Sequence, residues 1–79
     1  MKLTIISPEN VIFEGYTDKV CVPGSKCPFE ILKGHAPIIS SLQSGVMSYT
    51  EAGEEKRLSV KGGFVEVSND EVVACVELG

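Results

Sequence analysis

Apolar and polar residues alternate with a period of two along much of the chain, which is the pattern of half-buried β-strands. The alternation is cleanest over residues 56–61, where Leu58 and Val60 fall on one side and three polar residues on the other. The pattern predicts strands over residues 2–6, 10–14, 19–22, a short piece around Phe29 and Ile31, 38–42, 45–50, 56–61, 64–67 and 71–78.

Turn residues separate these runs. Glu51–Glu55 is a polar, Gly-containing hairpin loop, Pro23-Gly24 ends one strand, and Gly62-Gly63 is expected to divide two others. Residues 64–78 are expected to form a hairpin split at Ser68–Asp70. No helix is predicted, because ten Val, six Ile and three Thr outweigh three Ala.

Several predicted strands are apolar on both faces. Val73 and Cys75 oppose the core side of the last strand, and Ile6 and Ile12 do so in the first two. Either a second sheet or a partner protein is expected to cover them. Short, evenly spaced strands of this kind favour a flattened β-sandwich or barrel.

The size of the chain sharpens this expectation. Its 79 residues are expected to form one domain, and so short a chain buries only a thin core. Yet 43% of the residues are hydrophobic, so part of the apolar surface is expected to lie outside, where it favours docking onto a partner.

Charge and cysteine content narrow the choice of partner and compartment. The net charge of −4, with scattered basic residues and no Trp, argues against nucleic acid. Three cysteines and no hydrophobic leader favour a reducing cytosolic setting without disulfides. The longest apolar run, Val72–Val76, cannot span a bilayer, so any membrane association is expected to be indirect.

The sequence offers little chemistry. His35, the only histidine, has no Ser or Cys beside it in a nucleophile pattern and reads as a turn or contact residue. Cys21, Cys27 and Cys75 lack zinc-site spacing and are expected to be buried as small hydrophobic residues. No catalytic residue, cofactor or metal is therefore expected.

A set of motifs nevertheless has a specific order and spacing. They are Ser7-Pro8-Glu9, Phe13-Glu14-Gly15, Val22-Pro23-Gly24-Ser25, Gly34-His35-Ala36-Pro37, Leu42 with Ser44-Gly45-Val46, and Val60-Lys61-Gly62-Gly63-Phe64-Val65-Glu66-Val67. In this order they closely resemble the epsilon-subunit family of F-type ATP synthases, whose mitochondrial counterpart is called delta. The resemblance runs from Leu3 to Glu77.

The resemblance implies a flattened sandwich of about ten strands in two sheets. It also implies a non-catalytic rotor subunit at the foot of the central stalk, bound to the gamma subunit and to the membrane ring. Such a subunit couples proton or sodium flow to ATP synthesis, which takes place elsewhere in the complex. Its expected location is the cytoplasmic face of the inner membrane, in a bacterium rather than an organelle.

The family pattern also assigns contact residues by motif position. Those expected to meet gamma are Ser7 and, in the Gly-His-Ala-Pro stretch, His35, Ala36, Pro37, Ile38 and Ile39. Those expected to face the ring are Lys26, Cys27, Pro28, Phe29 and Glu30. For Gly34 and Pro37 the alternative is that they only shape a turn.

The chain departs from the family pattern in two places. Cys27, Glu30 and Lys33 stand where glycines or a proline are common, and Pro28 stands where an acidic residue is often found. Many members also continue into a two-helix domain that inhibits ATP hydrolysis, whereas these residues stop at Gly79. No helical domain, ATP binding or helix-dependent inhibition is therefore expected of them.

The competing interpretation is a stand-alone β-sandwich adaptor or carrier domain, such as a lipoyl-type module. Such a module carries a modifiable Lys at an exposed hairpin tip. The candidate loop Glu51–Glu55 has no Lys, which disfavours the carrier version.

Overall fold

The computed structural model describes all 79 residues, and all its regular elements are β-strands. The strands are β1 (Lys2–Ile6), β2 (Val11–Tyr16), β3 (Lys19–Val22), β4 (Phe29–Leu32), β5 (Ile38–Leu42), β6 (Gly45–Glu51), β7 (Glu54–Ser68) and β8 (Glu71–Leu78). The all-β prediction is confirmed, with eight strands in place of about ten. The structure contains no helix of the length and apolarity needed to cross a membrane.

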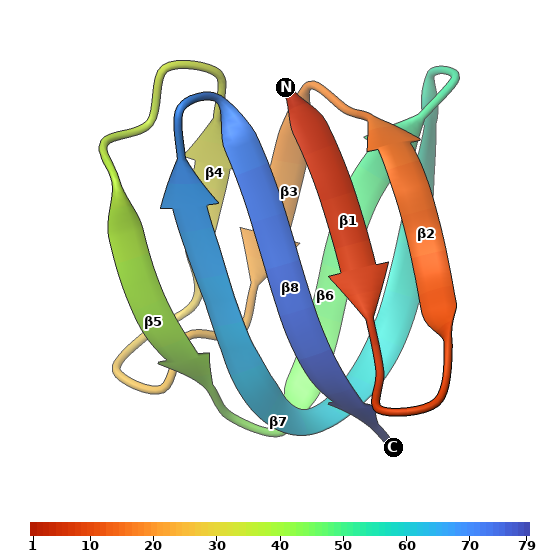
Figure 1. Ribbon diagram of the computed structural model, residues 1–79. Helices are drawn as coiled ribbons and strands as arrows, with labels where there is room; N and C mark the ends of the chain where they lie inside the picture. The colour runs from red at the N-terminus through yellow and green to blue at the C-terminus, as the bar shows by residue number, and fades with distance from the viewer.

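The strands form one hydrogen-bonded sheet that folds over at β7. Residues 54–60 of β7 pair with β6, whereas residues 60–68 pair with β8 and residues 63–67 also pair with β5. The front layer therefore contains β2, β1, β8, the second part of β7 and β5 (Figure 1). The back layer contains β4, β3, β6 and the first part of β7, so the predicted sandwich is present.

Gly62-Gly63 bends β7 and does not interrupt it. The sequence predicted two strands here, but the ladder with β8 continues through a register shift between Val60 and Gly62. Gly63 has a φ of 133°, a conformation open to glycine and costly for other residues. The two glycines thus let a single strand serve both layers, and the prediction of a break was wrong.

Two further features fix the front layer. The expected hairpin at Ser68–Asp70 is confirmed, and both Asn69 and Asp70 have positive φ, as a type I′ turn requires. β1 pairs in parallel with β8, so that Leu3 lies opposite Val72 and Ile5 opposite Ala74. The first and last strands of the chain therefore lie side by side in the middle of the front layer (Figure 1).

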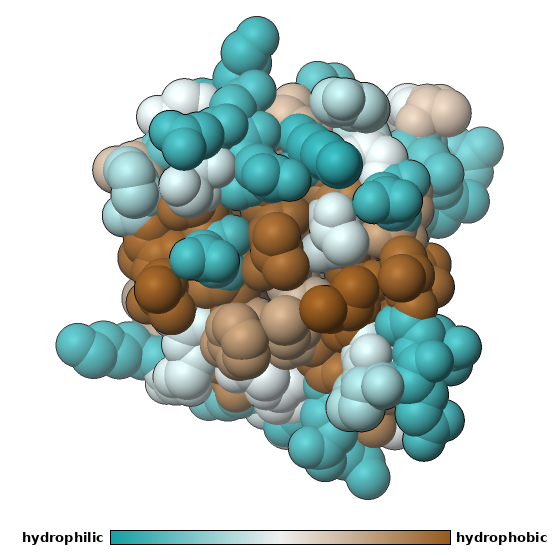
Figure 2. Space-filling model, viewed as in Figure 1, coloured by the Kyte–Doolittle hydropathy of each residue, from teal (hydrophilic) through white to brown (hydrophobic).

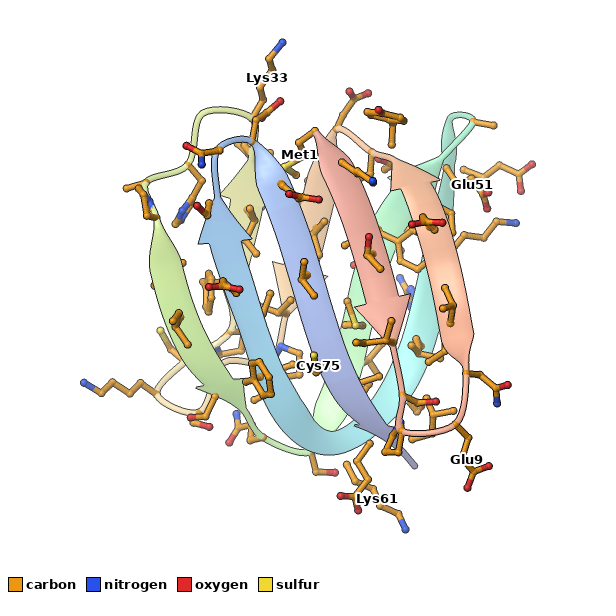
Figure 3. The ribbon with its side chains drawn as sticks, viewed as in Figure 1. Met1, Glu9, Lys33, Glu51, Lys61 and Cys75 are labelled. Atoms are coloured by element: carbon orange, nitrogen blue, oxygen red, sulfur yellow. The ribbon has the colours of Figure 1, made fainter.

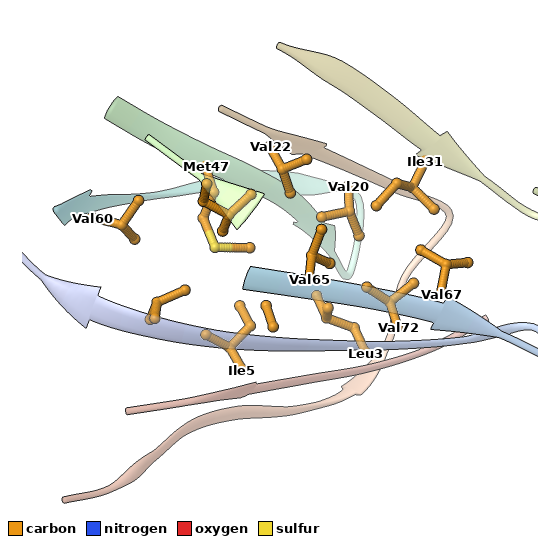
Figure 4. Packing of buried hydrophobic residues seen from close by; sticks show 13 residues of the cluster. Leu3, Ile5, Val20, Val22, Ile31, Met47, Val60, Val65, Val67 and Val72 are labelled. Carbon is orange, nitrogen blue, oxygen red and sulfur yellow. The ribbon is translucent and has the colours of Figure 1, made fainter. Parts of the chain in front are cut away.

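The core lies between the two layers. It contains 13 buried hydrophobic residues: Leu3, Ile5, Val20, Val22, Ile31, Leu42, Met47, Val60, Val65, Val67, Val72, Ala74 and Val76. Figure 4 shows Val20, Val22 and Met47 of the back layer facing Leu3, Ile5 and Val65 of the front layer. At the β2 side, the rings of Phe13 and Tyr49 close the gap, with centroids 4.6 Å apart.

The residues predicted to point away from the core divide into two groups. Ile12 packs against the core after all, because the register between β1 and β2 shifts and leaves Ile12 as the extra residue of a bulge in β2. Ile6, Val73 and Cys75 lie on the outer side of the front layer, half-buried, and no second sheet covers them. The sequence left two alternatives for these three residues, and the one that remains is that a partner protein covers them.

Candidate docking site

The largest hollow in the molecule is a groove between the Pro23–Pro28 loop and β5. It has a volume of about 540 Å³ and is lined by Ser25, Lys26, Cys27, Phe29, His35, Ile38, Ile39, Ser40 and Ser41. Two hydrogen bonds hold the loop against β5. Ser25 N–H donates to the carbonyl of Ser41 at 2.9 Å, and Ser41 Oγ donates to Ser25 Oγ at 2.8 Å.

His35 lies at one end of this groove in a local turn. Its backbone N–H donates to the carbonyl of Leu32 at 3.0 Å, its Nδ1 lies 2.7 Å from the carbonyl oxygen of Ala36, and its ring centroid is 6.4 Å from that of Phe29. Gly34 has a φ of 84°, so it shapes the turn. The His35 ring is hydrogen-bonded to the Ala36 carbonyl and to no Ser or Cys side chain, and the structure contains no group of three His, Cys, Asp or Glu residues able to hold a metal ion.

The following residues form a second, shallower hollow. Pro37, Ile38 and Ile39 line it together with Glu66, Val67 and Ser68 of β7. Ile39 is 71% exposed and faces outward, whereas Ile38 pairs with the inward-facing Val67 and is only 36% exposed. Ile39 therefore offers the larger contact surface of the two isoleucines.

Ser7 does not join this cluster. It begins the turn between β1 and β2, where its N–H donates to the Asn10 carbonyl at 2.8 Å and its Oγ accepts the Asn10 N–H at 3.3 Å. Glu9 of the same turn lies at the end of the molecule opposite Lys33, which is part of the His35 turn (Figure 3). Ser7 is therefore separated from the His35 turn, although both are expected gamma contacts.

The predicted ring-facing residues also separate. Lys26, Cys27 and Phe29 line the groove beside His35, Ile38 and Ile39. Pro28 is exposed outside it, and Glu30 lies on the outer side of the back layer. There the Glu30 carboxylate lies 3.7 Å from Lys19 Nζ and accepts a long hydrogen bond from the Cys21 thiol.

The cysteines are not buried as the sequence suggested. All three are free thiols: Cys27 is exposed, and Cys21 and Cys75 are half-buried. The side chain of Cys21 lies on the outward side of β3. The side chain of Cys75 lies on the outward side of β8 (Figure 3). The reason is strand parity, since their neighbours Val20, Val22, Ala74 and Val76 occupy the core.

The site contains residues that motif reasoning missed. Glu66 lines the second hollow, and Phe64 lies exposed two residues before it on the same face of β7. Both belong to the Gly-Gly-Phe-Val-Glu-Val motif, which supported the resemblance without suggesting a role for either residue. The available signal was the outward parity of Phe64 and Glu66, opposite to the buried Val65 and Val67.

A family model matches residues 1–77, and its description is "ATP synthase, Delta/Epsilon chain, beta-sandwich domain". The chain belongs to this family. The match covers all eight strands except the last residue of β8, so the family's β-sandwich is the fold described above.

Curated relatives are consistent with this assignment. The chain is 37% identical over 79 residues to an ATP synthase epsilon chain of Leptospira interrogans, covering 100% of this chain and 62% of the relative. It is 38% identical over 73 residues to that of Carboxydothermus hydrogenoformans, covering 92% and 54%. The chain thus spans little more than half the length of these two relatives.

Two solved structures share the fold. A chain of the Euglena gracilis mitochondrial ATP synthase, in a structure of OSCP, F1 and c-ring, matches with a TM-score of 0.86 at 19% identity, covering 94% of this chain and 48% of that chain. A chain of the Tetrahymena thermophila central stalk and c-ring matches at 0.80 and 14%, covering 96% and 62%. At these identities the likeness concerns the fold alone.

Proposed function

We propose that this delta/epsilon-family domain acts as a non-catalytic rotor subunit of the central stalk in a proton- or sodium-translocating F-type ATP synthase. It binds the gamma subunit and the membrane ring, and so helps couple ion flow to ATP synthesis. The observation that carries the proposal is the family match over residues 1–77. The relatives named epsilon chain, and the ATP synthase assemblies that hold similar folds, support it.

The geometry supports a docking role in one further respect. The groove brings Lys26, Cys27 and Phe29, expected to face the ring, beside His35 and Ile39, expected to meet gamma. One corner of the sandwich is therefore able to contact both partners. The domain would reach the membrane only through these partners, on the cytoplasmic face.

Co-purification with the gamma subunit, followed by titration calorimetry, tests this proposal. Ile39→Lys should weaken binding by about tenfold or more, because it removes an exposed apolar anchor and places a charge at the contact. Val46→Lys is the matched control, since Val46 is also an exposed aliphatic residue, at 54%, but lies on β6 of the back layer. The proposal fails if the wild-type chain does not associate with gamma.

A further inference from the structure

An apolar band crosses the outer face of the front layer from β5 to β2. Phe64 of β7 lies opposite Cys75 of β8, Cys75 opposite Ile6 of β1, and Ile6 opposite Val11 of β2. Ile39 and Val73 lie in the adjacent cross-strand row, on either side of Glu66. Together Ile6, Val11, Ile39, Phe64, Val73 and Cys75 form what we call the outer band, seen as the brown belt in Figure 2.

Three of the molecule's eight exposed large hydrophobic residues belong to the outer band. Val11 is 64% exposed, Ile39 71% and Phe64 48%. The corresponding face of the back layer is polar in its middle, where Cys21 lies between Glu30 and Ser48, and Ser48 lies opposite Arg57. A contiguous apolar belt on one face of so small a domain marks an interaction surface.

Most charged side chains on the outer face of the front layer are acidic, and Lys26 lines the groove at the Ile39 edge. Glu14, Glu66, Glu71 and Glu77 lie on the same outer face, where Lys2 is the one basic side chain. None of these carboxylates forms an ion pair, whereas Glu30, Glu54 and Glu55 elsewhere pair with Lys19, Lys56 and Arg57. The front face thus offers acidic groups that its own chain leaves without a counter-ion.

Glu66 is the carboxylate that a covering partner must meet. Its cross-strand neighbours are Ile39 and Val73, both part of the outer band, and its side chain lines the hollow that it shares with Pro37 and Ile38. Covering a carboxylate with apolar surface opposes binding unless a cation or hydrogen-bond donors compensate for the lost hydration. A partner that supplies a cation at this point is favoured, and one that does not is rejected.

We propose that the outer band docks a protein surface whose apolar side chains surround a Lys or Arg, and that Glu66 receives this cation and selects the partner. This inference rests on the proposed function, in which the surface belongs to the gamma subunit. It extends the contact from the Ile39 edge across β7, β8 and β1 toward the Ser7 turn. The two separated groups of expected gamma contacts then lie at the two ends of one continuous surface.

Other occupants fit the charge pattern less well. A second copy related by a two-fold axis would bring the same acidic face against itself, and like charges across an interface oppose association. Anionic lipid headgroups and nucleic-acid phosphates would meet the same repulsion. A basic protein surface is the occupant that complements both the apolar and the acidic features.

The first test measures the affinity of the purified gamma subunit for three chains: the wild type, Glu66→Gln and Glu66→Lys. Loss of one partner of a covered charge pair should weaken binding by roughly tenfold to a hundredfold, and the reversed charge should weaken it further. Glu51→Gln is the matched control, because Glu51 is an exposed carboxylate at the far hairpin. Added salt should weaken the wild-type complex more than the Glu66→Gln complex.

The second test concerns the apolar part of the outer band. Val11→Lys should weaken gamma binding by about tenfold or more, whereas Val46→Lys on the back layer should not. Both valines are exposed, at 64% and 54%, so both variants should keep the wild-type melting temperature. Analytical ultracentrifugation of the wild type alone should show a monomer.

The outcomes separate this inference from the proposed function. If gamma binds the wild type but Glu66→Gln, Glu66→Lys and Val11→Lys all bind equally well, the inference is overturned and the rotor assignment stands. If gamma does not bind the wild type, both are overturned. Dimers that Val11→Lys dissociates would assign the outer band to a second copy and overturn the inference.

Discussion

Gly63 is the residue on which the shape of β7 depends most directly. Its φ of 133° is unfavourable for a side chain, and a Cβ built there would collide with the carbonyl oxygen of Cys75 and approach Val76 Cα to 2.9 Å. These obstacles are backbone atoms of β8, which cannot move without disrupting the ladder. The close approach of two strands at the bend therefore requires glycine.

Gly63→Ala should lower the free energy of unfolding by about 3 kcal/mol, from backbone strain and the steric collision together. Urea unfolding followed by circular dichroism measures this loss. Gly53→Ala is the matched control: Gly53 also has a positive φ, of 80°, but nothing lies within 4 Å of its added Cβ. If the two variants lose equal stability, the close approach to β8 does not matter.

Tyr49 has a shifted acidity that predicts a pH effect. Partial burial raises the pKa of its phenol above the usual 10.0, and the negative charge of Glu51 raises it further, while Lys56 acts in the opposite direction. The folded state therefore holds the phenol proton more tightly than the unfolded chain does. This contribution to stability is complete below pH 10 and disappears as the pH rises through the folded-state pKa.

Tyr49→Phe should accordingly flatten the fall in stability above pH 10. The measurement is the melting temperature of each variant as a function of pH. Tyr16→Phe serves as the control, because Tyr16 is 77% exposed on the outer edge of the sandwich. An unchanged alkaline profile for Tyr49→Phe would contradict the assignment.

At the scale of elements, the connection from β2 to β3 carries the chain from the front layer to the back layer. Thr17, only 5% exposed, secures this crossing. Its Oγ1 lies 2.8 Å from Thr50 Oγ1 and accepts the Thr50 N–H at 3.1 Å, and its own N–H donates to the Met1 carbonyl at 3.0 Å. One side chain thus links β6 to the connection that leads out of β2.

Thr17→Val keeps the shape of this side chain but leaves the Thr50 N–H without its acceptor. A loss of about 2 kcal/mol in the free energy of unfolding is expected. Thr4→Val is the control, because Thr4 lies on the outer side of β1, where valine suits a strand at least as well. Equal stability of Thr17→Val and the wild type would show that this bond network contributes little.

The sequence predicted elements better than their pairing. The period of two identified the inward sides of residues 2–6, 56–61 and 71–78, because a half-buried strand imposes that alternation locally. It did not predict that β1 and β8 pair in parallel, since that pairing joins residues more than 60 positions apart. The sequence also predicted a break at Gly62-Gly63, because glycine occurs both in turns and in bent strands. Only the pairing with neighbouring strands distinguishes a turn from a bend.

At the scale of the whole molecule, the residues of the candidate site were likewise easier to predict than their arrangement in space. Among the contact residues expected from motif positions, one part lines a single groove and the rest lie outside it. The residues in the groove are Lys26, Cys27, Phe29, His35, Ile38 and Ile39. Motif positions did not identify the outer band, because its members come from five strands and meet only through the register of the front layer. We propose the outer band of the front layer as the docking face, because it joins exposed apolar residues from five neighbouring strands.

The three native thiols provide a direct test of which face of the sandwich docks. Cys75 lies in the outer band, Cys27 in the groove, and Cys21 on the polar outer side of the back layer. Alkylation rates can be measured by mass spectrometry for the free chain and for the chain assembled with gamma and the ring. Each thiol is compared with its own rate in the free chain, which removes the difference in intrinsic exposure.

Docking through the front face and the groove predicts that assembly slows alkylation of Cys75 and Cys27 by at least about tenfold, while Cys21 reacts at its free-chain rate. Protection of Cys21 with Cys75 left reactive would place the interface on the back layer and contradict the account. Unchanged rates at all three cysteines would show that neither the front face nor the groove is a docking surface.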